Sequence, residues 1–311
     1  MAAKFEMSDL GRLTYYLGIE VNQYEGGIML KQERYAERIL EEAGMRKCNV
    51  VFTPMESGLK MSKAQEEAGI EERVYRRNIG CLRYLLHTRP DLSFCVGVLS
   101  RYMHESKTSH GAALKQILRY LRGTTSYGLN YTRSKKTGLV GYSEISRSRL
   151  DEAGLVDYSD SSHNVDEDDG KSTTGHVFYL NQCPITWCSQ KQETVAMSSC
   201  KAEFMAATEA AKQAIWLQEL LGEITGQESE KVVIQIDNKS TIALTKNPVF
   251  HGRMEVEHVP GSEQKADILT KALGRIKFTE MRNLVGIKDI SKEKINLKGE
   301  NVSLNLKDKQ N

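Results

Sequence analysis

The sequence has no apolar run near the roughly 18 residues that a membrane-spanning helix needs, and its amino terminus lacks the apolar segment of a signal peptide. We therefore expect a soluble, intracellular protein, cytoplasmic or nuclear, that is not secreted. A large excess of charge is also missing. The 43 basic and 41 acidic side chains leave a formal charge of +2, so any basic surface for a nucleic acid must be local.

Cysteine is scarce and shows no pattern. The six cysteines form no Cys-x-x-Cys pair, which favours reduced thiols over a disulfide framework. Cys183 and Cys188 with His176 fit no familiar zinc spacing. The 40% hydrophobic content of 311 residues is enough for one large core or two modest ones, so an organisation in two parts is natural.

The first part has the pattern of a strand pair followed by helices. The stretch Tyr24-Glu25-Gly26-Gly27 is a turn signal between two apolar runs, and Arg89-Pro90-Asp91 interrupts a long helical pattern. The expected elements are a hairpin over 13–31, a helix over 32–43 that ends at Gly44, a connecting loop over 53–72, and helices over 75–122.

Basic side chains then gather with tyrosines between them. The cluster contains Arg119, Arg122, Arg133, Lys135 and Lys136, with Tyr120, Tyr127 and Tyr131 interleaved. Phosphate contacts alternating with aromatic platforms would give this pattern, so the five basic residues are candidate nucleic-acid contacts. A solvated linker with snorkelling side chains is the alternative, and composition alone favours it.

The second part begins with a repeat. The segment Leu139-Val140-Gly141-Tyr142-Ser143-Glu144 recurs 16 residues later as Leu155-Val156-Asp157-Tyr158-Ser159-Asp160. Only one copy can occupy a single central strand. Strands over 154–161, 175–180 and 185–189 predict an antiparallel meander that feeds an α/β unit, and the acidic turn Asp166–Gly170 is interpreted as solvated.

Four carboxylates stand where an ordinary fold has no use for one: Asp160, Glu203, Asp237 and Asp267. Asp160 lies inside a predicted strand, where an unpaired charge is disfavoured. Glu203 leads the apolar stripe of a helix that begins at Ser198 or Ser199 and ends near Leu221, before Gly222.

The other two acids follow predicted strands. Asp237 ends the apolar run 232–236, at the carboxyl end of a parallel strand, where α/β sheets bind ligands. Asp267 opens a helix over 266–273, after a strand over 256–259. A cap, a turn or the helix dipole explains each acid singly. Their joint placement favours one divalent-metal site, because clustered acids without bases need cations to hold them.

Over nearly its whole length the chain resembles the carboxyl-terminal part of the polyprotein of plant Ty1/copia-type retrotransposons. The resemblance is carried by Met7-Ser8-Asp9-Leu10-Gly11 with Tyr16-Leu17-Gly18-Ile19-Glu20-Val21, Tyr158-Ser159-Asp160, Lys171-Ser172-Thr173-Thr174-Gly175, Ser198-Ser199-Cys200-Lys201-Ala202-Glu203-Phe204, Ile236-Asp237-Asn238-Lys239-Ser240, and Ala266-Asp267-Ile268-Leu269-Thr270-Lys271. Taken as a set, these segments are highly specific.

The resemblance implies an α/β fold with a ribonuclease H-like mixed five-stranded sheet and helices. An α+β segment, like the thumb and connection of a reverse transcriptase, would precede it. The expected division is 1–134 for the carboxyl-terminal segment of the reverse transcriptase with its primer-grip hairpin, 135–288 for the ribonuclease H-like domain, and 289–311 for a polar, disordered tail.

The resemblance also implies that Asp160, Glu203, Asp237 and Asp267 are both the catalytic and the metal-binding residues, and that they share two Mg²⁺ ions. Such ions would lower the pKa of a bound water, orient it in line with the phosphorus and stabilise the departing 3′ oxygen. The implied partners are an RNA/DNA hybrid, whose RNA strand is recognised by its 2′-hydroxyl, and the remainder of the polyprotein.

The chain also departs from the family pattern. The Tyr-x-Asp-Asp segment of the polymerase palm is absent, so we expect no DNA synthesis from this chain alone. Lys201 stands where the family usually has Glu, and Ser162 where a second Asp is common. Arg253 runs straight into Met254, where the family has a further helical stretch. Residues 238–254 still supply the dozen residues that a parallel crossover needs, so the sheet can close.

Two hypotheses remain from the sequence. The first is a ribonuclease H-type endonuclease fragment that uses two metal ions. The second is a catalytically inactive retroelement relic with at most weak nucleic-acid binding through residues 119–136. An unrelated α/β scaffold, whose acids serve only as caps, is disfavoured by the specificity of the segments.

Overall fold

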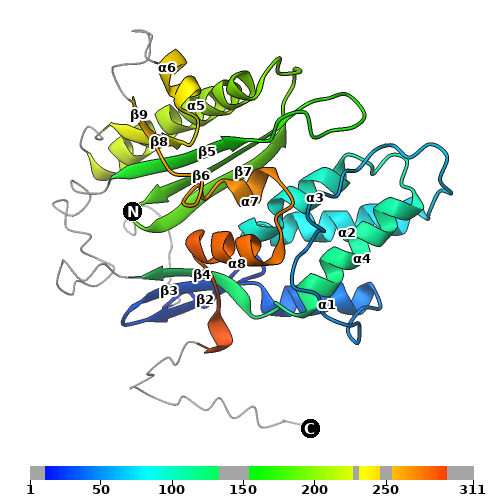
Figure 1. Ribbon diagram of the computed structural model, residues 1–311. Coiled ribbons are helices and arrows are strands. Elements are labelled where there is room, and N and C mark those ends of the chain that lie inside the picture. The colour runs from blue at the N-terminus through cyan, green and yellow to red at the C-terminus, as the bar shows by residue number, and fades with distance from the viewer. Residues whose placement is uncertain (1–10, 133–153, 227–230, 246–253, 293–311) are drawn as a thin grey trace, which may run out of the picture.

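Two five-stranded sheets organise the chain in the computed structural model, which describes residues 11–132, 154–226, 231–245 and 254–292 (Figure 1). The first sheet has the order β1-β2-β3-β4-β10, and all its neighbours are antiparallel. Its strands are β1 (Tyr15–Tyr16), β2 (Ile19–Tyr24), β3 (Gly27–Lys31), β4 (Tyr127–Thr132) and β10 (Ile287–Asp289). The predicted hairpin is confirmed as β2 and β3.

Strand β4 corrects the interpretation of the basic cluster. A solvated linker is wrong for residues 127–132, because they pair with β3 on one side and β10 on the other. The aromatic side chains there serve the sheet, and Tyr127 and Tyr131 are half-buried against the core. Alternating Tyr, Leu and Tyr is a strand pattern, which the surrounding charges obscured.

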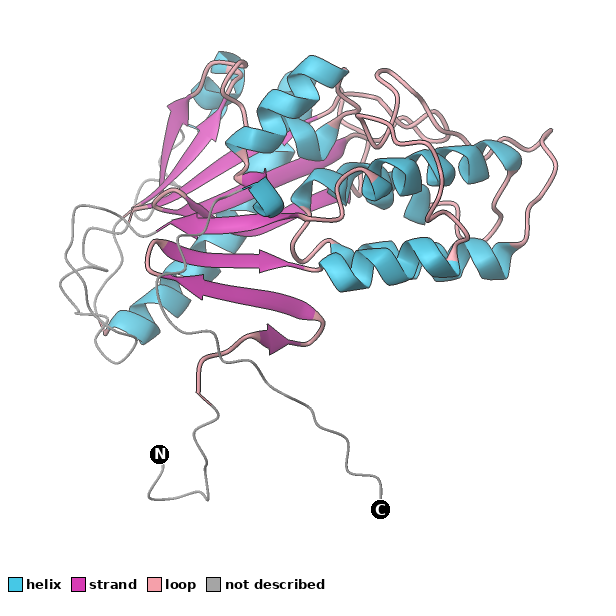
Figure 2. Cartoon of the chain, turned by 90° about the horizontal axis from the view of Figure 1, so that it is seen from below, coloured by secondary structure: helices cyan, strands magenta, loops and turns pink. Residues whose placement is uncertain are grey.

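Helices pack beside the first sheet, as the view from below shows (Figure 2). They are α1 (Glu33–Glu42), α2 (Glu72–Leu85), a 3₁₀ turn (Pro90–Leu92), α3 (Ser93–Ser100), α4 (Thr108–Arg122) and α8 (Arg275–Leu284). The predicted helices, the loop between α1 and α2 and the break before α3 are confirmed. Gly44 follows α1 with a φ of 68°, the left-handed conformation that ends helices and that glycine adopts freely.

The second sheet is mixed and has the order β7-β6-β5-β8-β9. Its strands are β5 (Leu155–Ser161), β6 (Thr173–Leu180), β7 (Cys183–Lys191), β8 (Val232–Ile236) and β9 (Met254–His258). The antiparallel meander β5–β6–β7 is confirmed, and β8 runs parallel to both β5 and β9. The predicted α/β class with a mixed five-stranded sheet is therefore confirmed.

The parallel crossover closes despite the shortened sequence before Met254. Five residue pairs join β8 to β9, from Val232 with Met254 to Ile236 with His258. Between the two strands lies α6 (Lys239–Thr245). The prediction that residues 238–254 suffice for this connection is confirmed. Of the repeated segment, the second copy is the central strand β5, and the first copy lies outside the described residues.

Helix α5 (Ser199–Thr225) lies along one face of the second sheet (Figure 1). Ser198 caps it by accepting a hydrogen bond from the Lys201 N–H at 3.2 Å. The predicted end before Gly222 is wrong, because the helix continues to Gly226, whose φ of 73° is left-handed. A stripe of buried alanines lets α5 approach the sheet closely: Ala202, Ala206, Ala207, Ala210, Ala211 and Ala214.

The end of the described chain returns to the first sheet. Strand β10 pairs with β4, and Phe278 of α8 makes an edge contact with the Tyr120 ring at a centroid distance of 5.5 Å. The predicted boundary between residues 288 and 289 thus falls inside β10, and residues 290–292 form a 3₁₀ turn. Among the helices in the described ranges, none has the length and apolarity that a bilayer span requires.

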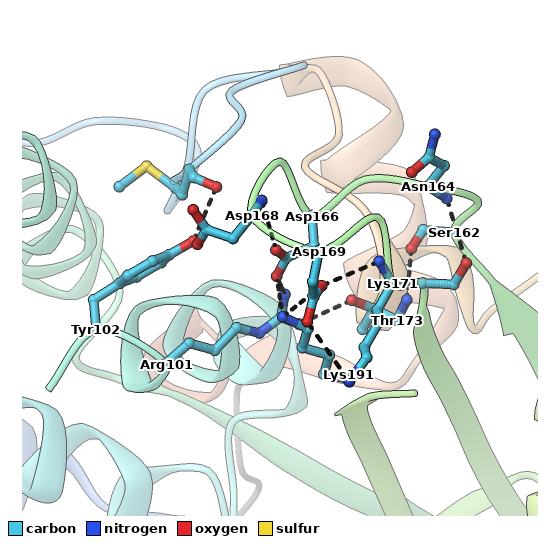
Figure 3. A network of polar contacts seen from close by, with 12 residues as sticks. Arg101, Tyr102, Ser162, Asn164, Asp166, Asp168, Asp169, Lys171, Thr173 and Lys191 are labelled. Atoms are coloured by element: carbon cyan, nitrogen blue, oxygen red, sulfur yellow. Dashed lines mark hydrogen bonds and ion pairs between the residues drawn. The ribbon is translucent and has the colours of Figure 1, made fainter. Parts of the chain in front are cut away.

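A second link between the parts is a network of charged side chains around the loop after β5 (Figure 3). Asp166 forms ion pairs with Arg101 at the end of α3, at 2.9 Å, and with Lys191 of β7, at 2.7 Å. The Arg101 guanidinium also donates to the Thr173 hydroxyl. The prediction of a solvated acidic turn is wrong for Asp166, whose side chain is 1% exposed, because two cations compensate its burial.

Candidate metal centre

The four predicted acids come from four separate elements of the second part. Asp160 lies near the carboxyl end of the central strand β5, and Asp237 directly follows β8. Glu203 lies in the second turn of α5, and Asp267 is the first residue of the short helix α7 (Asp267–Thr270). Since β5 and β8 are parallel neighbours, their carboxyl ends meet at one edge of the sheet.

Three of these acids converge. One carboxylate oxygen from each of Asp160, Asp237 and Asp267 lies within 4.8 Å of the other two. Asp160 and Asp267 are buried, and Asp237 is half-buried. The structure therefore brings together residues that are as much as 107 positions apart in the sequence, with no fourth acid inside that distance in the described part of the chain.

Glu203 borders this group and is held by a neutral partner. Its Oε1 accepts a hydrogen bond from the Asn238 amide at 3.2 Å, while its buried Oε2 has no hydrogen-bond partner. Asn238 also caps α6, since its Oδ1 accepts from the N–H groups of Ser240 and Thr241. One side chain thus fixes the Glu203 carboxylate and the start of α6 together.

The position of Asp267 is fixed by the close packing of α7 against β6. A Cβ on Gly175 would lie 2.6 Å from Cγ2 of Thr270 and 2.8 Å from Cβ of Leu269, so only glycine admits the helix there. The Ser189 hydroxyl donates to the Leu269 carbonyl at 2.6 Å, and the Gln264 amide donates to the Ser159 carbonyl at 2.9 Å. These contacts give the glycine of the Lys171–Gly175 segment a physical role.

The electrostatics of the group are those of crowded acids. Burial raises the pKa of Glu203 to about 7, and the negative charges of Asp237 and Asp160 add to this in spite of the Asn238 hydrogen bond. Burial and then Asp160 raise the pKa of Asp237. Burial also raises the pKa of Asp267, and Lys271 offsets part of that rise. The cluster therefore favours an added positive charge.

Two lysines that the sequence reasoning missed lie against the acids. Lys271 approaches Asp267 Oδ1 at 2.8 Å and Asp160 Oδ2 at 3.4 Å, and Lys277 approaches Asp267 Oδ2 at 3.8 Å. The Thr270 hydroxyl also donates to Asp160 Oδ2. Lys271 stands directly after α7, four positions beyond Asp267, and this ion-pair spacing is the signal that would have found it.

The predicted nucleic-acid contacts are not gathered at this centre. Arg119 and Arg122 lie on α4, where their Nε–H groups donate to the carbonyls of Asn49 at 2.9 Å and Arg46 at 2.7 Å. Both side chains thus hold the segment after α1. The other three candidates, Arg133, Lys135 and Lys136, lie outside the described residues. Lys201, which stands where the family usually has Glu, is exposed at the start of α5.

One more acid, Asp157 of β5, lies in the core and was not predicted as a special residue. Asp157 is 0% exposed, on the strand face that also carries Leu155, and neither carboxylate oxygen has a hydrogen-bond partner. Burial raises its pKa well above the usual value, and the backbone N–H of Val177, which is near the carboxylate but outside hydrogen-bond geometry, offsets only part of the effect. Because the folded pKa exceeds the unfolded one, Asp157 lowers stability increasingly as pH rises above about 4.

Replacing Asp157 with valine is therefore expected to raise the free energy of unfolding at pH 7 by about 2 kcal/mol, since a buried group without partners is replaced by an apolar one. The gain shrinks toward pH 4. Urea unfolding followed by circular dichroism at the two pH values measures both effects. Asp157→Asn keeps the shape and removes the pH dependence with a smaller gain. A variant less stable than the wild type at pH 7 contradicts this account.

The donor set fits a hard divalent cation. All the candidate ligands are carboxylate oxygens, which Mg²⁺ and Mn²⁺ prefer, and the buried Oε2 of Glu203 has no partner within the protein. The three acids within 4.8 Å carry more negative charge than their neighbours neutralise. Lys271 and Lys277 contact only Asp160 and Asp267 of this group. The residues present are thus suited to hold such ions.

Comparison with known proteins places these segments in context. A profile described as reverse transcriptase (RNA-dependent DNA polymerase) matches residues 1–57. The chain is 34% identical to the Retrovirus-related Pol polyprotein from transposon RE2 of Arabidopsis thaliana, over 92% of this chain and 20% of that protein. It is also 34% identical to the Retrovirus-related Pol polyprotein from transposon TNT 1-94 of Nicotiana tabacum, over 92% and 22%. The chain spans about a fifth of the length of these relatives.

Among solved structures, the crystal structure of LC11-RNase H1 in complex with RNA/DNA hybrid aligns with a TM-score of 0.28 and 14% identity, over 37% of this chain and 93% of that chain.

Proposed function

The chain belongs to the Pol polyprotein family of copia-type retrotransposons, and from this premise we propose that it is a ribonuclease H-type endonuclease fragment. It would hydrolyse the RNA strand of RNA/DNA hybrids with two divalent metal ions. The observation that carries the proposal is the convergence of Asp160, Asp237 and Asp267 at the carboxyl ends of parallel strands, with oxygens within 4.8 Å of one another.

The roles of the residues follow from their positions. Asp160, Asp237, Asp267 and Glu203 would hold two Mg²⁺ ions, with Asn238 fixing Glu203 and the Thr270 hydroxyl fixing Asp160. Bound ions would supply Lewis-acid stabilisation of charge on the phosphodiester and lower the pKa of a water. Glu203 would border the cluster beside Asp237, because its carboxylate accepts a hydrogen bond from Asn238, the residue that follows Asp237.

The two parts of the chain would have different functions. Residues 1–134 would form the end of the reverse transcriptase, and the second sheet with its helices would form the nuclease. We expect no DNA synthesis by this chain alone, because the palm segment with its metal-binding aspartates is not part of the sequence. The partners would be an RNA/DNA hybrid and the rest of the polyprotein. As a retroelement product, the chain would act inside the cell, in the cytoplasm or nucleus.

The inactive-relic hypothesis depends on disturbance of the frame that holds the acids. That frame requires β8 to lie between β5 and β9, and both pairings are formed. Glycine at position 175 also retains the close approach of α7. These features favour the active nuclease over the relic.

The test is cleavage of an end-labelled RNA/DNA hybrid by the full-length chain. The full chain is needed because α8 and β10 pack against the first sheet, so a fragment starting at residue 135 would lose the strand that pairs with β10. We expect cuts in the RNA strand in Mg²⁺ or Mn²⁺ and none with a chelator. Single-stranded RNA and DNA duplexes of the same sequence are the controls. A cooperatively folding chain that leaves the hybrid uncut would favour the relic.

A further inference from the structure

Within the described residues, Lys271 contacts two of the clustered acids, and the proposed function gives this lysine no role. It follows α7 directly, and its ammonium lies 2.8 Å from Asp267 Oδ1 and 3.4 Å from Asp160 Oδ2. The two carboxylates belong to different elements, so the ammonium bridges helix and strand. Its side chain is 40% exposed, which leaves it a path toward solvent.

The cations of the site are distributed unevenly. Asp160 and Asp267 have Lys271 between them, and Lys277 lies against the other oxygen of Asp267 at 3.8 Å. The hydrogen-bond partner of Glu203, by contrast, is the uncharged amide of Asn238. Asp160 and Asp267 are therefore in direct contact with a cation, whereas within the described residues neither Asp237 nor Glu203 forms an ion pair.

A divalent ion and the Lys271 ammonium compete for the same oxygens. Mg²⁺ binds carboxylate oxygens at about 2.1 Å, closer than an ammonium does. An ion shared by Asp160 and Asp267 would therefore lie a few ångströms from a fully charged nitrogen in a largely buried place, where like charges repel strongly. The lysine can relieve this repulsion, because its flexible four-carbon stem can carry the ammonium into solvent.

We propose that Lys271 is a resident counter-ion that holds the half of the site between Asp160 and Asp267 and must withdraw before a second divalent cation binds there. The first cation then binds on the side of Asp237 and Glu203, and the two cations bind with unequal affinity. This inference rests on the proposed function, since it assumes that the four acids are the metal ligands. Lys271 would thereby set the concentration of divalent cation at which both metal positions are filled.

The test is titration of the full-length, metal-free chain with Mn²⁺, followed by calorimetry and by the electron paramagnetic resonance signal of free Mn²⁺. For the wild type we expect one tight site and a second that is at least about 100-fold weaker. Lys271→Met keeps the apolar stem and removes the charge, so it should tighten the second site about tenfold or more. Lys277→Met is the matched control, because Lys277 touches Asp267 but does not bridge it to Asp160.

A second readout is the stability of the metal-free chain. Lys271→Met should lower the melting temperature without metal, since the crowded acids lose their counter-ion, and should enlarge the rise on adding Mn²⁺. The inference is overturned if Lys271→Met leaves the second dissociation constant within twofold of the wild type, or if Lys277→Met tightens it equally. If neither the wild type nor the variants bind Mn²⁺, the proposed function fails as well. Two equally tight sites in all three proteins would overturn the inference alone.

Discussion

Asp237→Asn is expected to lower the rate of hybrid cleavage by about a thousandfold or more, which corresponds to roughly 4 kcal/mol of lost transition-state stabilisation. Asparagine has the same shape, but its amide is neutral and turns an N–H donor toward the place of a cation. Asp237 belongs to the group of three acids whose oxygens lie within 4.8 Å, and it follows the strand β8 that neighbours β5.

The fold is not expected to suffer from this change. Burial and the charge of Asp160 raise the pKa of Asp237, so the carboxylate destabilises the metal-free fold and the amide should be tolerated. Single-turnover cleavage in Mg²⁺ and the midpoint of urea unfolding separate the two effects. Glu257→Gln on the exposed edge strand β9 is the matched control and should keep the wild-type rate. Retention of more than a tenth of the rate in Asp237→Asn would sink the proposed ligand set.

Asp91→Asn should destabilise the fold by about 3–5 kcal/mol, the usual cost of removing one partner from a buried ion pair. Asp91 and Arg89 are each about 1% exposed, and two hydrogen bonds of 2.9 and 2.8 Å join the guanidinium to both carboxylate oxygens. The same guanidinium donates to the Thr124 carbonyl, and the Tyr120 hydroxyl donates to Asp91. The variant leaves the buried Arg89 charge uncompensated.

This network also joins α4 to α8, since Arg282 of α8 donates to the Tyr120 hydroxyl at 3.2 Å. Burial opposes ionisation of Asp91, but Arg89 and Tyr120 outweigh it and lower the carboxyl pKa. Its stabilisation is therefore present above the unfolded pKa and is lost as pH falls through the folded one. Urea unfolding at pH 7 measures the effect.

Two companion variants make the Asp91 prediction specific. Glu209→Gln, which removes the exposed ion pair with Lys212, should cost less than about 0.5 kcal/mol. The double replacement Arg89→Met with Asp91→Leu should recover much of the stability lost in Asp91→Asn, because it removes both buried charges. A loss below 1 kcal/mol in Asp91→Asn would mean that the pair is not buried in solution.

Local pattern in the sequence predicted most of the elements. The turn at Tyr24–Gly27, the left-handed glycine after α1, the serine cap of α5 and the apolar run of β8 are short-range signals, and each is confirmed. They succeed because turn geometry, capping and strand burial depend on a few neighbouring residues. Errors arose where a local signal was weak. Gly222 has the pattern of a helix end, yet a single glycine inside a helix costs only about 1 kcal/mol, and the left-handed residue that ends α5 is Gly226.

The sequence by itself determined the element order of the second part from β5 to α7, the class of the second sheet and four acids as candidates for one site. Only the tertiary structure decided which charges meet. Asp166 was interpreted as solvated until Arg101 and Lys191 were seen to bury it, and Arg89-Pro90-Asp91 was no more than a helix break until the two charges closed on each other. Lys271 became a partner of Asp160 only when α7 packed on β6 beside β5. The physical reason is that the electrostatic energy of a group depends on distance and burial, which chain folding sets across long separations in sequence.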